Sequence, residues 1–391
     1  MLRSLYSGIS GLRSHQTMLD VTGNNIANVN TTGFKASAVQ FQDTLSQLTQ
    51  GGAGAPRADV GGTNPAQIGL GVQVAGISTN FSQGSAQSTG RATDMMISGD
   101  GFFVTRQGGE TLYTRGGSFD FDAQGRLVTP DGAMVQGWAA VGGEIAQGGA
   151  TGNVTLPVGT VSPAAATRAA TMDGNLPADA APGTEIVRDV RVYDASGAAR
   201  SLTLTFTKSG TGWDVAGSDQ NGQAGAGTLA FTNGALTGGG TVAVGGITVD
   251  LSGLTGFSGL STASISRQDG REAGSLDSFS ISKDGTVVGS FSNGTTQSIA
   301  RIALATFVNP GGLEKAGSSG YRASFNSGVA TLGAPGDAGA GALLGGTLEM
   351  SNVDLSQEFT NLIVAQRGFQ ANARIITTSD EVLQELTNLK R

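Results

Sequence analysis

The N-terminal end of the chain carries apolar side chains at alternating spacings of three and four residues. Such a series falls on one face of an α-helix, and two of its positions, Gln16 and Gly23, are weak. The stripe consists of Leu2, Leu5, Ile9, Leu12, Gln16, Leu19, Gly23 and Ile26. The pattern predicts an N-terminal amphipathic helix about 40 Å long, at about 1.5 Å per residue.

The C-terminal end repeats the same spacing. Its stripe consists of Phe359, Leu362, Gln366, Phe369, Ala373, Ile376, Asp380 and Leu383, after which Leu386 and Leu389 drift onto the neighbouring stripe. Ser351, Asn352 or Asp354 is expected to cap this helix, and Lys390 and Arg391 suit the negative end of its dipole. We expect this second helix to be about 55 Å long.

Packing of both helices on the protein's own core is the simplest interpretation, but their position at the extreme ends of the chain argues against it. A lone pair of long helices has no third layer to cover its outer faces, and such helices are marginal until further copies bundle with them. The pattern therefore favours self-assembly. The side chains expected to carry it are Leu2, Leu5, Ile9, Leu12, Leu19, Ile26, Phe359, Leu362, Phe369, Ile376, Leu383 and Leu386.

Between about residues 70 and 350 the pattern changes to short alternating strands separated by turns. Apolar Leu202, Leu204 and Phe206 alternate with threonines, which is typical of a half-buried strand. The turn at 194–197 joins this strand to an earlier one through Val190 and Val192. Further strands are predicted around Trp213 and Val215, in a hairpin around Gly245 and Gly246, and on both sides of Asp284-Gly285. We expect this whole region to be antiparallel β structure.

Shifts in composition suggest a nested order of domains, and no tandem repeat points to a solenoid. The predicted fold class is mainly β with terminal α. The expected parts are an inner, coiled-coil-like helical polymerisation domain (1–33 and 352–391), an extended connector (34–70), a middle β domain (71–147 and 277–351) and an outer, variable β domain (148–276).

Composition excludes several classes of function. The chain of 391 residues has a formal net charge of −7, a single histidine (His15) and no cysteine. His/Cys zinc sites, iron–sulfur clusters, thiol nucleophiles and disulfides are therefore impossible, and nucleic-acid binding is disfavoured because phosphate contacts need clustered cations. The N-terminus shows no secretory signal, and no apolar run is long enough to span a membrane.

No motif in the sequence points to catalysis. There is no Gly-Lys dipeptide for a phosphate-binding loop and no Gly-x-Ser-x-Gly elbow. Asp120, Asp122, Gln124 and Asp131 approach the spacing of a calcium loop, but their flanks are strand-like, so a β-hairpin turn through 122–125 is the better interpretation. We expect no enzymatic activity, no cofactor and no metal.

Several long motifs resemble one protein family. Residues 22–35 read TGNNIANVNTTGFK, residues 351–355 read SNVDL, and residues 364–373 read VAQRGFQANA. Shorter pieces lie at 69–74, 97–103 and 284–289. These segments are similar to the signatures of the bacterial flagellar rod and hook proteins, and the resemblance covers roughly 1–140 and 277–391.

The resemblance implies an axial tube in which terminal helices line an export channel. The length of the chain and its β insertion favour a hook-type subunit, a curved universal joint that transmits torque, over the shorter distal-rod type. By resemblance the partners are further copies of the chain, the distal rod, the hook cap, the hook–filament junction proteins and the flagellar type III export apparatus. The expected location is extracellular, reached without a cleaved signal peptide.

Two questions stay open at this point. A surface adhesin would share the Gly/Thr-rich β composition, but it leaves the terminal helices unexplained. The segment from Asn24 to Lys35 is interpreted either as a helix end with a turn or as an inter-subunit joint. For the joint, the resemblance implicates Asn24, Asn25, Asn28, Gly33, Phe34, Lys35, Gln366, Arg367 and Asn372.

Overall fold

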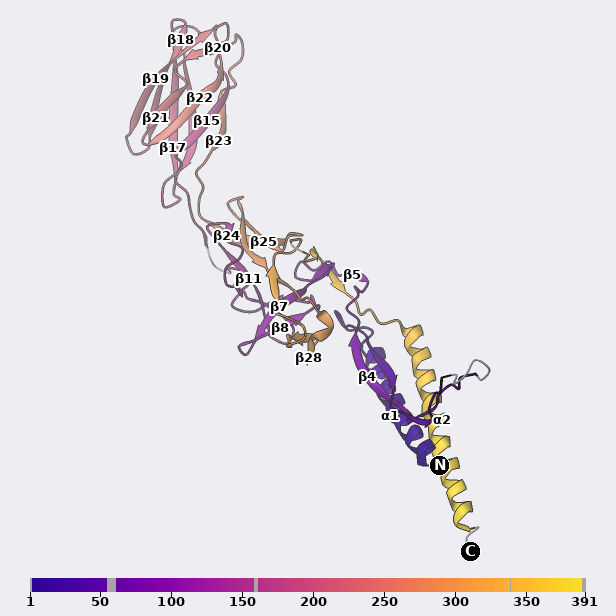
Figure 1. Cartoon of the computed structure of the whole chain (residues 1–391). Helices are drawn as coiled ribbons and strands as arrows, with labels where there is room; N and C mark the ends of the chain where they lie inside the picture. The colour runs from indigo at the N-terminus through magenta and orange to yellow at the C-terminus, as the bar shows by residue number, and fades with distance from the viewer. Residues whose placement is uncertain (1, 55–60, 158–160, 338, 389–391) are drawn as a thin grey trace. The chain divides into compact units, whose positions relative to one another are not determined.

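The computed structural model describes residues 2–54, 61–157, 161–337 and 339–388, so the expectations for Leu389, Lys390 and Arg391 lie outside the described residues. The chain divides into two compact units. The first unit comprises Met1–Leu156, Ser280–Val288 and Ser298–Arg391, and the second comprises Pro157–Phe279 and Gly289–Gln297. The predicted fold class, mainly β with a helix at each end, is confirmed (Figure 1).

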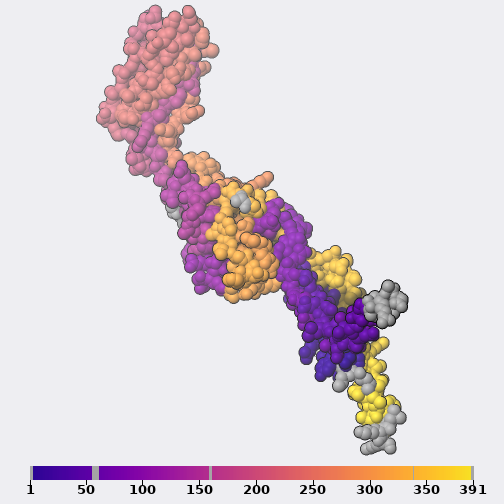
Figure 2. Space-filling view, viewed as in Figure 1, coloured from indigo at the N-terminus to yellow at the C-terminus, as the bar shows by residue number. Residues whose placement is uncertain are grey.

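The two terminal helices, α1 (Leu2–Ala27) and α2 (Leu355–Asn388), pack against each other in antiparallel orientation (Figure 1). The Asp354 carboxylate caps α2 by accepting the Ser356 N–H at 2.8 Å, so Asp354 is the cap among the three expected candidates. Because α2 is the longer helix, its C-terminal part, yellow in Figure 2, extends beyond the indigo of α1.

Small residues form the closest contact of α1 with α2. A Cβ on Gly11 would lie 2.7 Å from the Asn372 side chain, and one on Gly368 would lie 2.5 Å from the His15 ring. Glycine at these positions lets the two helix backbones approach closely. The buried residues of α1 are Gly8, Gly11, Ser14, Thr22 and Asn25. The described apolar side chains of the α1 stripe are half-buried beside this contact.

A third layer covers α1 on another side, which the sequence pattern missed. Strands β1 (Ser37–Asp43) and β4 (Val72–Thr79) form an antiparallel pair that packs against this helix. The Val72 N–H donates to the Ser10 hydroxyl at 3.2 Å, and the Phe41 ring meets His15 edge-on at 5.8 Å between centroids. The segment expected as an extended connector thus carries paired strands, since β2 (Ser46–Gln50) also pairs with β3 (Ala66–Gly69).

The rest of the first unit is a β domain in which the order β26-β11-β7-β8-β29-β28 forms the central sheet path. Its two faces carry separate aromatic clusters, one with Phe102, Tyr113 and Tyr321 and one with Phe103 against Phe119. Its elements are β5 (Ala86–Ser88), β6 (Met95–Ser98), β7 (Phe102–Gln107), β8 (Glu110–Thr114), β9 (Asp120–Phe121), β10 (Leu127–Val128), β11 (Met134–Val141), β12 (Glu144–Ile145), β13 (Gly152–Asn153), β26 (Thr296–Ile302), β27 (Leu304–Thr306), the 3-10 helix Pro310–Gly312, β28 (Glu314–Gly317), β29 (Gly320–Arg322), β30 (Thr331–Gly333), β31 (Ala342–Gly345) and β32 (Thr347–Glu349).

The second unit is a sheet in the order β16-β17-β18-β19-β20-β22-β15-β23, with β21 paired to β22. Its strands are β15 (Ala169–Asn175), β16 (Glu185–Tyr193), β17 (Ala199–Ser209), β18 (Gly212–Asp219), β19 (Ala224–Thr232), β20 (Ala235–Gly238), β21 (Thr241–Val244), β22 (Ile247–Thr255) and β23 (Ser264–Gln268). The short strand β14 (Val161–Ser162) is not part of this sheet and pairs with β24. Strands β24 (Gly274–Ile281) and β25 (Thr286–Phe291) each contain a point where the chain passes between the units.

The predicted hairpins of the second unit are confirmed, but one pairing is not antiparallel. The hairpins β16–β17 and β21–β22 form as expected, and the alternating Leu202, Leu204 and Phe206 are buried in its core. Strand β15 instead runs parallel to β22. A parallel pair needs a long crossover, here the intervening meander β16–β21, and local turn signals cannot reveal such a crossover.

The calcium-like segment folds as the predicted hairpin turn. Strands β9 and β10 pair on its two sides, and Gly125 has φ +76°. The Asp122 carboxylate accepts the Gln124 and Arg126 N–H groups and pairs with the Arg126 side chain at 2.7 Å. This carboxylate is thus used by the turn itself. Asp284-Gly285 likewise forms a turn, with Gly285 at φ +76°.

The turn between β28 and β29 holds two serines in a strained conformation. Ser318 and Ser319 have φ +49° and +56°, the left-handed pair of a type I′ turn, which favours Asn-Gly. The double substitution Ser318→Asn/Ser319→Gly is expected to raise the free energy of unfolding of the first unit by about 1 kcal/mol. Urea unfolding measures this change. The matched Ser318→Ala/Ser319→Ala variant should show no gain, and an equal gain in both variants would contradict the explanation by backbone strain.

Candidate functional site

The candidate site for self-assembly is the apolar surface of the helix pair. Phe359, Phe369, Leu383 and Leu386 of α2 are exposed, and Phe359 retains 51% of its accessible surface. The remaining predicted residues are half-buried: Leu5, Ile9, Leu12, Leu19 and Ile26 on α1, and Leu362 and Ile376 on α2. Leu2 begins α1, but its side chain is not among those described. The structure thus gathers uncovered apolar surface on α2 rather than sharing it between the helices.

Further exposed apolar side chains on α2 were missed by the single-stripe interpretation. They are Ile363, Val364, Ile375 and Val382, and Tyr6 of α1 is exposed as well. A helix that is apolar on more than one side is expected to be buried on more than one side. The drift of Leu386 onto a neighbouring stripe was the signal for this second band. We call the exposed apolar residues of α2, from Phe359 to Leu386, the α2 band.

The asparagine-rich segment after α1 bonds within its own chain. The buried Asn25 amide donates to the Ser37 carbonyl at 2.8 Å and to the Glu358 carboxylate at 3.0 Å, and it accepts the Ser37 N–H at 3.0 Å. Asn28 donates to the Asn24 carbonyl at 2.9 Å. These amides are thus used inside the chain, and bonding of Asn25 and Asn28 to a neighbouring copy stays a prediction.

Gly33 allows the chain to pass against the β domain. It has φ +68°, and a Cβ there would lie 2.5 Å from the Gly116 nitrogen. Its N–H donates to the Glu349 carbonyl at 2.8 Å, which joins the N-terminal segment to the end of β32. Any side chain at this position would therefore meet both backbone strain and a backbone atom.

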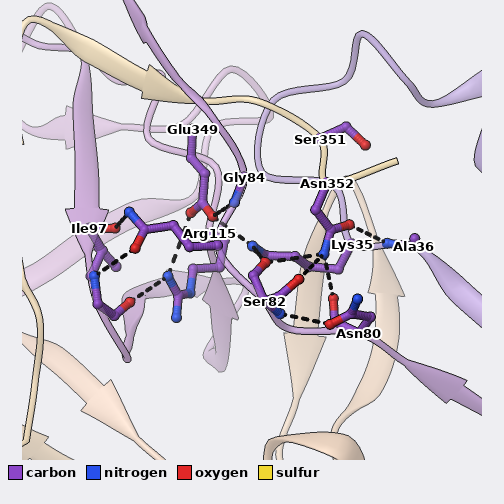
Figure 3. A network of polar contacts seen from close by, with 12 residues as sticks. Lys35, Ala36, Asn80, Ser82, Gly84, Ile97, Arg115, Glu349, Ser351 and Asn352 are labelled. Carbon is purple, nitrogen blue, oxygen red and sulfur yellow. Dashed lines mark hydrogen bonds and ion pairs between the residues drawn. The ribbon is translucent and has the colours of Figure 1, made fainter. Parts of the chain in front are cut away.

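Lys35 is the centre of a buried polar network between distant parts of the chain (Figure 3). Its ammonium donates to the Glu349 carboxylate at 2.6 Å and to the Ser82 carbonyl at 2.7 Å, and both charged side chains are fully buried. The same Glu349 oxygen accepts the Gly84 N–H at 2.9 Å. Lys35 is thus bonded within its own chain, and its role in a joint between subunits stays a prediction.

Arg115 completes the charge balance of this network. Its guanidinium lies 3.5 Å from the second Glu349 oxygen, donates to the Gly99 carbonyl at 2.9 Å, and stacks over the Phe102 ring at 5.3 Å. Burial lowers the pKa of both Lys35 and Arg115, while the charge and hydrogen bonding of Glu349 oppose both shifts. Two buried cations therefore share the Glu349 carboxylate, and Asp100 adds a weaker attraction on Arg115.

Asn352 extends the same network to the start of the C-terminal segment. Its side chain accepts the Ala36 N–H at 2.8 Å and donates to the Asn80 carbonyl at 2.8 Å and the Ser82 carbonyl at 3.1 Å (Figure 3). Beside it, the Lys315 ammonium lies over the Phe34 ring at 5.3 Å. We call Lys35, Arg115, Glu349 and Asn352 with the backbone of 82–84 the junction.

The other motif residues lie on the helices. Asn24, Gln366 and Arg367 are exposed, which leaves them free for contacts with another molecule. Asn372 donates to the Gly368 carbonyl at 2.9 Å and packs against Gly11, so it belongs to the helix pair. Among the described residues, no group of three or more His, Asp or Glu side chains could hold a metal, and no helix is long and apolar enough to cross a membrane.

Comparison with known families matches three parts of the chain. Residues 5–35 match the flagella basal body rod protein family, residues 96–175 the D1 domain of flagellar hook protein FlgE/F/G, and residues 344–389 the C-terminal region of the flagellar basal body rod FlgEFG proteins. The first and last of these matches contain the N-terminal signature and the α2 band.

Full-length relatives agree with these matches. The flagellar hook protein FlgE of Borreliella burgdorferi is 40% identical over the full length of both chains. FlgE of Escherichia coli is 38% identical over 98% of each chain, and the flagellar basal-body rod protein FlgG of Bacillus subtilis is 38% identical over all of both. The structure of Helicobacter pylori flagellar hook protein FlgE2 aligns with 66% of this chain and 98% of its own, at 15% identity and a TM-score of 0.48.

These relatives extend over all or nearly all of the chain, and the family matches at its two ends cover most of the helix pair and Lys35, Glu349 and Asn352 of the junction. The chain therefore belongs to the family of bacterial flagellar hook and rod proteins, and it is a structural protein rather than an enzyme.

Proposed function

We propose that the chain is the subunit of the flagellar hook and self-assembles into a curved tube outside the cell. The observation that carries this proposal is the α2 band, because a long helix with exposed apolar residues on more than one side needs further helices to cover it. Each Å² of apolar surface buried between copies contributes about 25 cal/mol. A bundle of many copies thereby stabilises what one copy leaves exposed.

In this proposal the parts of the chain have separate duties. Residues 1–33 and 352–391 form the inner polymerisation domain around an export channel, 71–147 and 277–351 the middle domain, and 148–276 the outer domain. The tube acts as a universal joint that carries torque from the rod to the filament. Its partners would be the distal rod, the hook cap, the hook–filament junction proteins and the type III export apparatus, which exports the chain without a cleaved signal.

Electron microscopy of the polymer tests this function. Purified full-length chain, concentrated in a salt that strengthens apolar association, is expected to form hollow tubes with a curved resting shape. Failure to form tubes, or tube formation by a chain that lacks both terminal helices, would refute the proposal.

A distal-rod subunit is the second candidate. The full-length match to the rod protein FlgG of Bacillus subtilis, at 38% identity, favours it. The same images separate the two functions, because a rod subunit would form straight, stiff tubes and a hook subunit curved ones.

A further inference from the structure

A group of apolar side chains stands fully exposed on the β domain of the first unit. Val308, Phe325 and Val329 retain 93%, 106% and 88% of their accessible surface. Their loops lie together, since a Cβ on Gly328 would be 3.9 Å from Val308 and the Asn309 amide donates to the Asn326 carbonyl at 3.0 Å. We call these three side chains the knob.

The loop that presents the knob is ordered by its own hydrogen bonds. The Ser327 hydroxyl is buried, accepts the Ser324 N–H at 3.0 Å and donates to the Ser324 carbonyl at 2.8 Å. The Ser324 hydroxyl bonds the Gly312 carbonyl at 2.5 Å. Phe325 is therefore held outward by a fixed turn. Exposed aromatic side chains on a fixed turn are typical of interface anchors.

A pocket of about 280 Å³ in the same β domain can receive such a side chain. Its walls are formed mostly by small and methyl-bearing side chains, including Thr32, Leu112, Pro130 and Ala133. We call this pocket the socket.

The knob and the socket lie on opposite faces of the same two strands. A second pocket lies on the side of the knob, and its walls include Phe325 and Val329 of the knob. The same walls include Val104 and Arg106 of β7 and Thr111 and Tyr113 of β8. The intervening Thr105, Gln107, Leu112 and Thr114 line the socket. The register pairs Val104 with Tyr113 and Thr105 with Leu112. Successive side chains of a strand point to opposite faces, so the two surfaces face opposite ways.

Charge is complementary across the two faces. Arg106 lies beside the knob and Asp131 beside the socket; both are exposed. No ion pair to either side chain occurs within the described parts of the chain.

We propose that the knob of one copy inserts into the socket of the next copy, with Arg106 pairing with Asp131 of that copy. A contact between opposite faces is heterologous, so it leaves a free knob at one end and a free socket at the other, and copies add until a ring closes or a helical filament grows. The inference rests on the proposed self-assembly and specifies one direction of contact within the polymer.

Disulfide trapping tests the contact directly, because the natural chain has no cysteine. The full-length Phe325→Cys/Pro130→Cys variant, assembled and then oxidised, is expected to give a ladder of covalent dimers, trimers and longer chains on a non-reducing gel. Phe325→Cys alone cannot extend beyond dimers. Polymers that form normally but give no ladder would overturn the inference while leaving the proposed function intact.

Charge reversal provides a second measurement that does not depend on the cysteines. Arg106→Asp and Asp131→Arg are each expected to raise the protein concentration at which assembly begins by about tenfold, and the double variant is expected to restore most of the loss. Arg267→Asp, an exposed change in the second unit, is the matched control. Equal effects of Arg106→Asp and Arg267→Asp, or no rescue in the double variant, would overturn the pairing. A wild-type chain that never polymerises would refute both proposals.

Discussion

Replacing Glu349 with Gln is expected to lower the free energy of unfolding of the first unit by about 3–5 kcal/mol. The substitution keeps the size of the side chain but removes the carboxylate that faces Lys35 at 2.6 Å and Arg115 at 3.5 Å. Lys35 would then stay buried without its ion-pair partner, and Arg115 would lose the larger of the carboxylate attractions that act on it, which costs far more than the loss of an exposed ion pair.

The two tryptophans of the chain make this measurement specific. Trp138 lies in the first unit and Trp213 in the second, and both are buried. Urea unfolding of a Trp213→Phe background, followed by fluorescence, reports the first unit, and a Trp138→Phe background reports the second. The second unit should be unaffected by Glu349→Gln.

Two companion variants separate loss of charge from general damage. Glu314→Gln makes the same chemical change on an exposed strand and should cost no more than about 0.5 kcal/mol. Lys35→Met added to Glu349→Gln should recover part of the loss, because one buried cation is removed. The explanation fails if Glu349→Gln costs no more than Glu314→Gln.

Phe359→Ser combined with Leu386→Ser is expected to prevent assembly without unfolding the chain. Both side chains belong to the α2 band and are exposed at 51% and 47%, so the monomer should lose less than about 1 kcal/mol. In a polymer they would be buried anchors, each contributing about 2 kcal/mol or more. The concentration needed for assembly should rise about 1000-fold, because the two losses add to about 4 kcal/mol and each 1.4 kcal/mol is a factor of ten.

Light scattering against protein concentration measures that threshold, and circular dichroism checks that the helices remain. Gln370→Ser, an exposed polar position on the same helix, is the matched control and should leave the threshold unchanged. An unaltered threshold in the double variant would exclude the α2 band as an assembly surface.

Local patterns predicted the elements of the fold well. Alternation around Leu204 and the Asp-Gly and Gly-Gly turns were enough for the hairpins, because a hairpin depends on neighbouring residues. The three-and-four spacing likewise predicted both helices. The parallel pairing of β15 with β22 was not predicted, because it joins strands that are far apart in sequence.

The candidate site was less accessible from sequence. The helix contact uses Gly8 and Gly11, which matter because they let the backbones of α1 and α2 approach closely. A glycine adds nothing to a hydrophobic pattern, so the sequence did not reveal this contact. The bond of Lys35 to Glu349 spans 314 positions. A lysine in a polar, turn-rich segment is ordinarily exposed. Only the tertiary fold shows which carboxylate forms an ion pair with it.

The junction also sets an order of events for a chain that emerges with its N-terminus first. Lys35 emerges early in synthesis, but its counter-charge, Glu349, lies 314 positions later in the sequence. Contacts this distant in sequence form late and slowly. A chain that ended before Glu349 would lack the counter-charge of Lys35, so burying this lysine would be costly. The junction between the N-terminal and C-terminal segments could then not form. The junction can therefore form only after synthesis has passed Asn352, just before α2 begins.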